Sequence, residues 1–257
     1  MDRNVMVVCF CLLAVCMGCA QNKYRRSDAA SYYEAAQKKM RNRKCYDAEL
    51  LLTNLLSDFP GSHLVDEAQF MMGEAFQCQK DYVSAIFEYE RLLNEYPLSP
   101  QADAARFQIG ECYYQEAQNI NHDQDETEKA IREFQRFAED YPQSDLVPRA
   151  KDRILELRYR LASKQVMVAD DYLTWGYYPS AQLIAEDVIQ QFGDTKAIHE
   201  ARLVVAEAKY KMGKLEEALG ILTLLAGAEV GTKIQKQVVD IRSKVQEAMD
   251  KTNVTKE

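Results

Sequence analysis

The residues of this chain that could carry out acid–base chemistry are few and scattered. The histidines are His63, His122 and His199; each falls in a segment that we expect to link two helices, where an exposed imidazole needs no special role. The carboxylate pairs Asp170-Asp171 and Glu216-Glu217 are expected on solvated helix faces, with no pocket to shift their pKa values. The sequence also lacks a phosphate-binding loop, a GxGxxG turn and an HExxH motif. It therefore predicts no catalytic residue, no metal and no cofactor, and thus a protein that is not an enzyme.

The thiols are the other groups with chemistry to offer. Of the seven cysteines, Cys45, Cys78 and Cys112 lie beyond the N-terminal segment, and no CxxC or CxxH spacing indicates a metal site. Cys45 is expected at the end of a helix–helix turn and Cys78 at the end of the next helix, so antiparallel packing could bring them together. In an oxidising compartment they would form a disulfide; alternatively, they remain separate buried thiols.

The first residues of the chain are typical of an export signal. An apolar run of eleven residues, Val5 to Val15, is too short to cross a bilayer and has the length of a signal-peptide core. Gly18 directly before Cys19 is similar to the bacterial lipobox, which implies that residues 1–18 are removed and that the Cys19 thiol is lipidated. An ordinary secretory signal cut nearby is the alternative. Two or more acyl chains would hold the protein stably on a membrane, with residues 19–28 as a polar tether.

A repeat of about 37 residues dominates the rest of the chain. A small residue recurs twelve positions before the end of an acidic/aromatic/proline-like triplet. The triplets are Asp58-Phe59-Pro60, Glu95-Tyr96-Pro97, Asp140-Tyr141-Pro142 and Gln191-Phe192-Gly193, and the small residues are Ala48, Ala85, Ala130 and Ala181, with Ala218 as a fifth. Such a period predicts an all-α, tetratricopeptide-like α-solenoid of about five helix-turn-helix repeats. Proteins of this class mostly bind other proteins.

The second repeat illustrates the tetratricopeptide pattern. With Gly73 at position 8, Ala85 falls at position 20, Tyr89 at position 24 and Pro97 at position 32. Positions 8 and 20 are small because the paired helices approach closely there. An added Cβ at Gly73 would force the helices apart, at an overpacking cost of about 1–3 kcal/mol. The position-8 residues of the other repeats are Ala36, Gly110, Ala169 and Ala206.

The chain is expected to divide into two sub-arrays. Residues 29–145 hold repeats one to three, and the third repeat contains an insertion of eight residues in the polar segment 117–126. From Arg149 to Trp175 there is neither glycine nor proline, which predicts a helix of about 28 residues that joins the sub-arrays. Residues 146–257 hold repeats four and five and a capping helix over Lys233 to Lys251, where apolar residues recur at helical spacing.

The first helix of each tetratricopeptide pair lines the concave groove. Aromatic side chains, amides and one arginine on this face would suit an extended, partly apolar peptide, whereas a net charge of −8 argues against nucleic acid. The predicted peptide-binding residues are Tyr33, Gln37, Met40, Arg41, Phe70, Glu74, Gln77, Phe107, Glu111 and Tyr114, with Cys78 and Gln115 beside them. In the alternative interpretation, Tyr33, Phe70 and Phe107 belong to the core between repeats.

Over about residues 28–250 the chain resembles the BamD (ComL) family of outer-membrane assembly lipoproteins. The residues that carry the resemblance are Asp140-Tyr141-Pro142-Gln143-Ser144-Asp145, Leu155, Arg160-Leu161-Ala162, Val168-Ala169, Tyr172-Leu173, Trp175 and Phe192-Gly193-Asp194-Thr195-Lys196-Ala197. The resemblance implies five repeats, a lipid on Cys19 and no enzymatic activity. It also implies an N-terminal pocket for targeting segments of unfolded outer-membrane proteins and a C-terminal half docked on the POTRA domains of BamA. Ala20, rather than aspartate, follows Cys19. In the family pattern this implies sorting to the outer membrane, where the protein would be anchored by lipid on the periplasmic face.

The alternative is another helical-repeat envelope lipoprotein, such as a Tol-Pal or cell-wall coordinator. Such coordinators usually carry a coiled coil ahead of the repeats, and the segment between Cys19 and Ser31 is too short for heptads. The insertion in repeat three is shorter than in well-known BamD proteins, and the chain is acidic. The resemblance therefore assigns regions to partners, and individual contact residues only as hypotheses.

Overall fold

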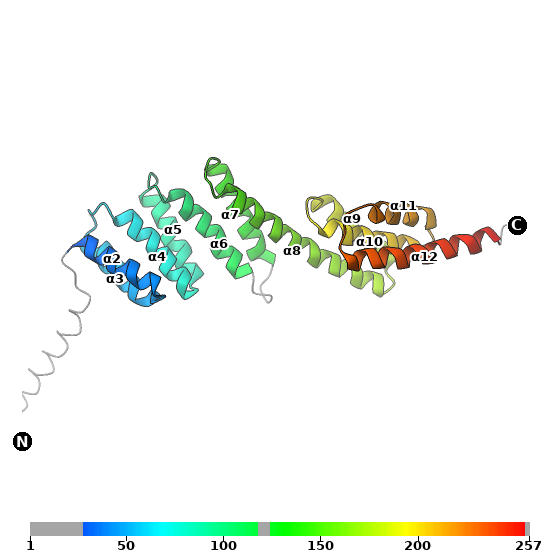
Figure 1. Ribbon diagram of the computed structural model, residues 1–257, viewed down its shortest axis with the longest axis horizontal. Helices are drawn as coiled ribbons and strands as arrows, with labels where there is room; N and C mark the ends of the chain where they lie inside the picture. Colours follow the sequence, from blue (N-terminus) through cyan, green and yellow to red (C-terminus); the bar gives the residue numbers. More distant parts are fainter. Residues whose placement is uncertain (1–27, 118–123, 255–257) are drawn as a thin grey trace, which may run out of the picture. The chain divides into compact units, whose positions relative to one another are not determined.

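The structure, a computed structural model, describes residues 28–117 and 124–254, and all regular secondary structure within them is helical (Figure 1). The helices are α2 (Ala29–Arg41), α3 (Cys45–Asp58), α4 (Val65–Gln79), α5 (Tyr82–Glu95), α6 (Ala102–Ala117), α7 (Gln124–Asp140), α8 (Val147–Thr174), α9 (Tyr178–Gln191), α10 (Ala197–Lys211), α11 (Leu215–Ala226) and α12 (Thr232–Val254). The all-α prediction is confirmed. The predicted signal, Cys19, most of the tether and His122 lie outside the described residues.

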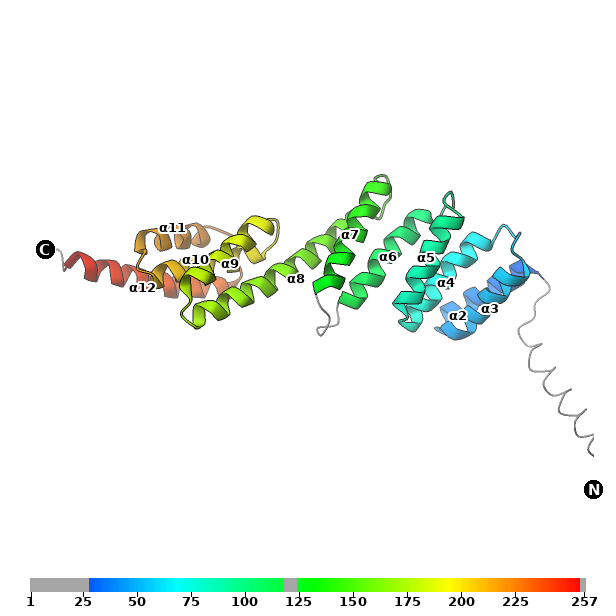
Figure 2. The same ribbon diagram turned by 180° about the vertical axis from the view of Figure 1, so that it is seen from behind.

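The contacts divide the chain into two compact units, of which the first ends at Val147 and the second begins at Pro148. In the first unit the helices pair as α2/α3, α4/α5 and α6/α7, and both views show these six helices following one another in chain order (Figures 1 and 2). In the second unit α10 packs against α9, α11 and α12. No helix of the described ranges is both long and apolar enough to cross a membrane.

The repeated sequence triplet forms one turn, which the chain makes four times. At the end of α5, the Tyr96 N–H donates to the carbonyl of Leu92 (2.8 Å), and the Tyr96 carbonyl accepts from the Ser99 N–H (3.0 Å). The Ser99 hydroxyl then accepts from the N–H of Gln101 (3.2 Å), just before α6. The same two backbone bonds form at Phe59/Ser62, Tyr141/Ser144 and Phe192/Thr195. The triplet therefore ends the second helix of one pair and turns the chain into the next pair.

Close approach of paired helices explains the small residues. A Cβ on Gly73 would lie 2.5 Å from Cε1 of Tyr89, and a Cβ on Gly110 would lie 2.7 Å from Cε1 of Phe134. No real Cβ tolerates such distances, so only glycine lets these rings lie against the facing helix. The five alanines at position 20, Ala48, Ala85, Ala130, Ala181 and Ala218, are all fully buried.

The long helix has the predicted length, since α8 spans 28 residues. Its second half contributes Ala162, Val166, Ala169 and Leu173 to a core shared with α9 and α10. The capping helix α12 buries Val238, Ile241 and Val245 against α10 and α11. These contacts make the second unit a packed array with its own core.

Two local predictions are corrected. His199 lies within the first turn of α10, half-buried, and not in a linker. The predicted insertion loop 117–126 is shorter than expected, because α6 includes Ala117 and α7 begins at Gln124; residues 118–123 lie outside the described ranges. The polar sequence in both places was compatible with a linker. In the structure, however, α10 begins at the buried Ala197 and α6 ends at the buried Ala117.

The alternatives for Cys45 and Cys78 resolve in favour of a bond. The two residues form a disulfide between the start of α3 and the end of α4, with their Cα atoms 6.1 Å apart. Cys112 is free and buried. The disulfide links the first and second helix pairs of the first unit, and a bond of this kind persists in an oxidising compartment.

Candidate interaction surfaces

The predicted groove residues of α2 lie at the surface of the first unit, partly supported by its core. Tyr33 and Met40 are half-buried and pack against the core formed by α2, α3 and α4, whereas Arg41 is exposed. Burial raises the pKa of the Tyr33 hydroxyl; a hydrogen bond with Gln37 acts in the opposite direction, and the nearby carboxylates of Glu67 and Glu74 raise the pKa further. The hydroxyl therefore stays protonated and can donate to a ligand.

On α4, the accessible part of the predicted groove is an aromatic ring followed one turn later by a carboxylate. The ring of half-buried Phe70 lies 5.4 Å from the ring of Tyr89. Glu74 is also half-buried, and burial raises the pKa of its carboxyl group. Among the described residues Glu74 makes no ion pair. A ligand that brought a cation or a hydrogen-bond donor to this carboxylate would replace the water that burial has removed.

Gln77 is half-buried, and its side chain is bonded within the first unit. Its side-chain oxygen accepts from the Tyr89 hydroxyl (2.8 Å), and its Nε2 donates to Oε1 of Gln108 (3.2 Å) and to Sγ of Cys112 (3.1 Å). Burial raises the pKa of the Cys112 thiol to about 12, although the hydrogen bond from Gln77 acts in the opposite direction. Gln77 thus ties α4 to α5 and α6, and its polar atoms are already committed.

Three predicted contributors from α6, Phe107, Glu111 and Tyr114, are buried. Phe107 is 1% exposed and lies 5.4 Å from the rings of both Phe134 and Phe137, and Glu111 and Tyr114 are buried as well. For Phe107 the structure therefore favours the core interpretation that the sequence left open. On α6 the predicted residue Gln115 is exposed. The other accessible predicted residues lie on α2 and α4: Tyr33, Gln37, Met40, Arg41, Phe70 and Glu74, with half-buried Gln77 and the disulfide-bonded Cys78.

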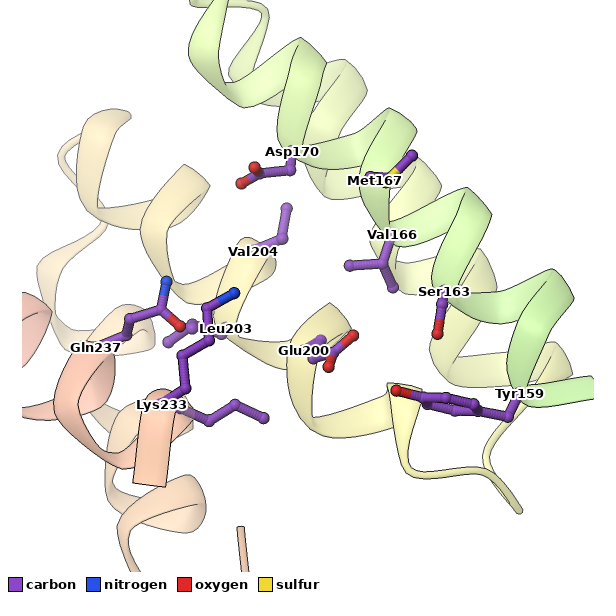
Figure 3. A pocket seen from close by; sticks show the side chains of 11 residues that line it. Tyr159, Ser163, Val166, Met167, Asp170, Glu200, Leu203, Val204, Lys233 and Gln237 are labelled. Carbon is purple, nitrogen blue, oxygen red and sulfur yellow. The ribbon is translucent and has the colours of Figure 1, made fainter. Parts of the chain in front are cut away.

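A second surface, which the sequence did not reveal, is a cavity of about 290 Å³ in the second unit. It lies between α8, α10 and α12 (Figure 3). Val166, Leu203 and Val204 form an apolar wall, and Met167 and Tyr159 stand at the edge with 67% and 40% of their surfaces exposed. These exposures make the cavity open enough to receive a side chain of another molecule.

Polar groups are placed around this apolar wall. Asp170 of α8 and Glu200 of α10 provide carboxylates, and Lys233 of α12 provides a cation (Figure 3). The Ser163 hydroxyl is buried and has no hydrogen-bond partner in the described part of the chain. A buried hydroxyl in this state gains free energy from any ligand that bonds to it. The cavity therefore suits a side chain with an aliphatic stem and a polar or cationic end.

Asp170, which was expected on a solvated helix face, is indeed exposed, but it lies at the edge of the cavity. The one signal of this surface in the sequence of α8 is its number of apolar residues. Leu155, Tyr159, Met167 and Val168 are apolar yet at least 40% exposed, so α8 carries more apolar surface than its packing uses. Three helices that are distant in sequence complete the cavity, which is why spacing along one helix could not reveal it.

The paired helices, the small residues at positions 8 and 20 and the repeated turn define a tetratricopeptide-repeat protein. The solved complex of the TPR2AB domain of yeast Sti1 with pHSP90 is similar in fold, with 14% identity, coverage of 87% of this chain and 84% of that chain, and a TM-score of 0.50. A tetratricopeptide repeat protein from Parabacteroides merdae is also similar, with 16% identity, 84% coverage of both chains and a TM-score of 0.38. No curated protein matches the chain.

The family follows from the sequence rather than from these structures. The family described as YfiO, outer membrane lipoprotein, matches residues 25–219, which cover most of the first unit and the second unit up to α11. The chain belongs to this family, which is the BamD family of outer-membrane lipoproteins. The resemblance found in the sequence is thus confirmed.

Proposed function

We propose that this protein is a non-enzymatic subunit of the outer-membrane β-barrel assembly complex, anchored to the periplasmic face of the outer membrane by lipid on Cys19. The observation that carries the proposal is the family match over residues 25–219. Two surfaces of suitable chemistry, one in each unit, support it. In this role the protein brings two polypeptides together and catalyses no reaction.

The α2–α4 face of the first unit receives the targeting segment of an unfolded outer-membrane protein. Strands of outer-membrane barrels alternate apolar and polar residues and carry aromatic girdles. An extended segment of this kind can lay its aromatic side chains against Tyr33, Met40 and Phe70 while a donor group meets the Glu74 carboxylate. Arg41, which is exposed at the end of α2, is placed to bind a C-terminal carboxylate.

The second unit docks on the POTRA domains of BamA through the cavity between α8, α10 and α12. An anchor side chain seated in a pocket, with polar groups around it, is the usual centre of a protein–protein interface. The unpartnered Ser163 hydroxyl and the carboxylates of Asp170 and Glu200 favour an anchor with a donor or a positive charge at its end.

Co-purification tests the assembly role. The lipidated protein, isolated from crosslinked and detergent-solubilised envelopes, is expected to carry BamA with it. Met167→Asp at the cavity edge should lose most of that BamA, whereas Leu224→Asp, on a leucine that is 70% exposed on α11, should retain it. If the unaltered protein brought down no BamA, the assembly role would be wrong, and a Tol-Pal or cell-wall scaffold would take its place.

A further inference from the structure

The turns between paired helices differ in one backbone feature. Seven residues after each position-8 residue, the chain adopts a left-handed conformation in four repeats. In the second unit these residues are Gly176 (φ 84°) and Gly213 (φ 77°), but in the first unit they are Arg43 (φ 54°) and Lys80 (φ 64°). Glycine adopts this conformation without steric cost, whereas a side chain is strained in it. Strain that the sequence retains at equivalent sites indicates a role for the side chains themselves.

The first of these turns lies in a strongly basic segment of an otherwise acidic chain, and the second turn adds Lys80. Residues 38–44 hold five lysines and arginines and no acidic residue, although the net charge of the chain is −8. Lys39 pairs with Asp47, and Asp81 is engaged as the N-cap of α5. In the described part of the chain, the remaining cations make no ion pair: Lys38, Arg41, Arg43, Lys44 and Lys80, all exposed.

Exposed apolar side chains stand next to these cations. Tyr46 and Val83, each near the start of its helix, are 74% and 71% exposed, and Leu50 and Phe87 follow one turn later. Because Tyr46 and Val83 are 37 residues apart, as are Leu50 and Phe87, they occupy equivalent positions in successive repeats and therefore share one face. The equivalents in the third repeat are Glu128 and Arg132, so this apolar face ends with the second helix pair.

The disulfide holds the two turns together. Cys45 directly follows Lys44, and Cys78 lies two residues before Lys80; their Cα atoms are 6.1 Å apart. The basic residues of both turns and the apolar residues behind them thus form one surface, which we call the basic turn surface and define as Arg43, Lys44, Lys80, Tyr46 and Val83.

We propose that the basic turn surface binds an anionic phospholipid bilayer. Lysine and arginine side chains are attracted to anionic headgroups, and tyrosine is favoured at the level of the headgroups. A surface that carries both, on a protein of an outer-membrane lipoprotein family, matches the chemistry of a membrane better than that of an acidic protein, which would not require an exposed Val83 beside the cations.

The length of the N-terminal segment permits this contact. The inference rests on the proposed anchor at Cys19, but not on the assembly role. The ten residues from Cys19 to Asp28 can extend about 30 Å over the steps between them, whereas α2, with 13 residues, is about 20 Å long. The turn at the far end of α2 can therefore reach the bilayer that holds the lipid.

Fluorescence quenching in vesicles tests the proposal with the full lipidated chain. In a Trp175→Phe background, which removes the single tryptophan, Tyr46→Trp places a probe on the basic turn surface and Leu224→Trp places a control probe on α11. The vesicles contain brominated phosphatidylcholine, alone or in equal parts with phosphatidylglycerol. The probe at position 46 should be quenched strongly only with phosphatidylglycerol and at low salt, and the probe at position 224 in neither case.

A charge variant separates binding from folding. Arg43→Gly with Lys80→Gly removes two charges and also relieves the backbone strain, so this variant should fold at least as well. Each lost charge is expected to weaken the contact about fivefold, or about 25-fold for the pair, which would abolish the quenching at position 46. The matched control, Lys196→Gln with Lys236→Gln, removes two exposed lysines of the second unit and should leave the quenching unchanged.

Two results would overturn the proposal: equal quenching in both lipid mixtures, or quenching that survives Arg43→Gly with Lys80→Gly. Failure of the anchor would be recognised separately, because the protein would not associate with vesicles and the mass of the Cys19 peptide would show no acyl chains.

Discussion

The helix pairs of the two units solve the same packing problem with different residues at positions 8 and 24. In the second and third pairs of the first unit, Gly73 faces Tyr89 and Gly110 faces Phe134. The first pair of that unit instead has Ala36 and Leu52, and the second unit has Ala206 and Leu222, all fully buried. The glycine pairs remove a side chain from one helix to make room for a ring from the other, whereas the alanine–leucine pairs divide the volume between two aliphatic side chains. The comparison indicates that the pair, and not the single position, is what a repeat must conserve.

The turns show the opposite preference. Glycine occupies the left-handed position in the second unit, at Gly176 and Gly213, while the first unit places Arg43 and Lys80 there. The first unit also has the Cys45–Cys78 disulfide, whereas no cysteine follows Cys112. The first unit therefore has close packing and a covalent link in its interior, and strained, charged residues at two turns.

Removal of the disulfide should have the largest effect on the free energy of unfolding. In Cys45→Ala with Cys78→Ala, the unfolded chain regains the freedom of a loop with a sequence separation of 33, which is worth roughly 3–4 kcal/mol. Denaturant unfolding of the full chain, followed by hydrogen exchange, should show faster opening of α3 and α4 and unchanged protection of α9 to α12. Equal loss of protection in both units would contradict the assignment of the bond to the first unit alone.

Substitutions at position 8 should have the second-largest effect on stability. Gly110→Ala drives a Cβ into the Phe134 ring and should destabilise the first unit by about 1–2 kcal/mol, because overpacking outweighs the gain in helix propensity. Phe134→Leu alone should also destabilise, by loss of buried volume. Gly110→Ala with Phe134→Leu recreates the pair found at Ala206 and Leu222, so the double variant should lose less than the sum of the single variants. Simple additivity in urea unfolding would show that the pair is not the conserved unit.

The features that were predictable from the sequence are those set by local side-chain volume. The repeat, the 28-residue helix and the close approach at Gly73 each depend on residue types at fixed spacing. The disulfide remained open because it depends on the register of α3 against α4. The burial of Tyr114 was missed and that of Phe107 stayed open, because both depend on how α6 packs against its neighbouring helices. The cavity that contains Ser163 requires α8, α10 and α12 together, and no spacing along one helix encodes it.

Substitutions at the left-handed turn positions should have the third-largest effect on stability, and the effect should have opposite signs in the two units. Arg43→Gly should stabilise the first unit by about 0.5–1 kcal/mol, because it relieves a left-handed side chain by more than glycine costs in the unfolded chain. Gly213→Arg should destabilise the second unit by about 1 kcal/mol. Thermal unfolding monitored by circular dichroism measures both changes. Should Arg43→Gly instead lower stability, a contact of its side chain must compensate for the strain.

Position 9 offers the finest test, because it carries Glu74 in the first unit and Asp170 in the second. Burial raises the pKa of Glu74 in the folded protein, so the folded state binds its proton more tightly than the unfolded state does. This contribution to stability is present below the ordinary pKa of a glutamate and is lost as the pH rises through the folded pKa. Glu74→Gln should therefore raise the unfolding free energy at pH 7 by under about 0.5 kcal/mol and leave it unchanged in acid. Asp170→Asn, at an exposed carboxylate, serves as the matched control and should change stability at neither pH.

In the same two variants, a client peptide that donates to Glu74 should bind the first unit less well after Glu74→Gln, at pH 7 only. Equal peptide binding by Glu74→Gln and Asp170→Asn would remove Glu74 from the proposed client surface and leave the aromatic side chains of α2 and α4 to define it.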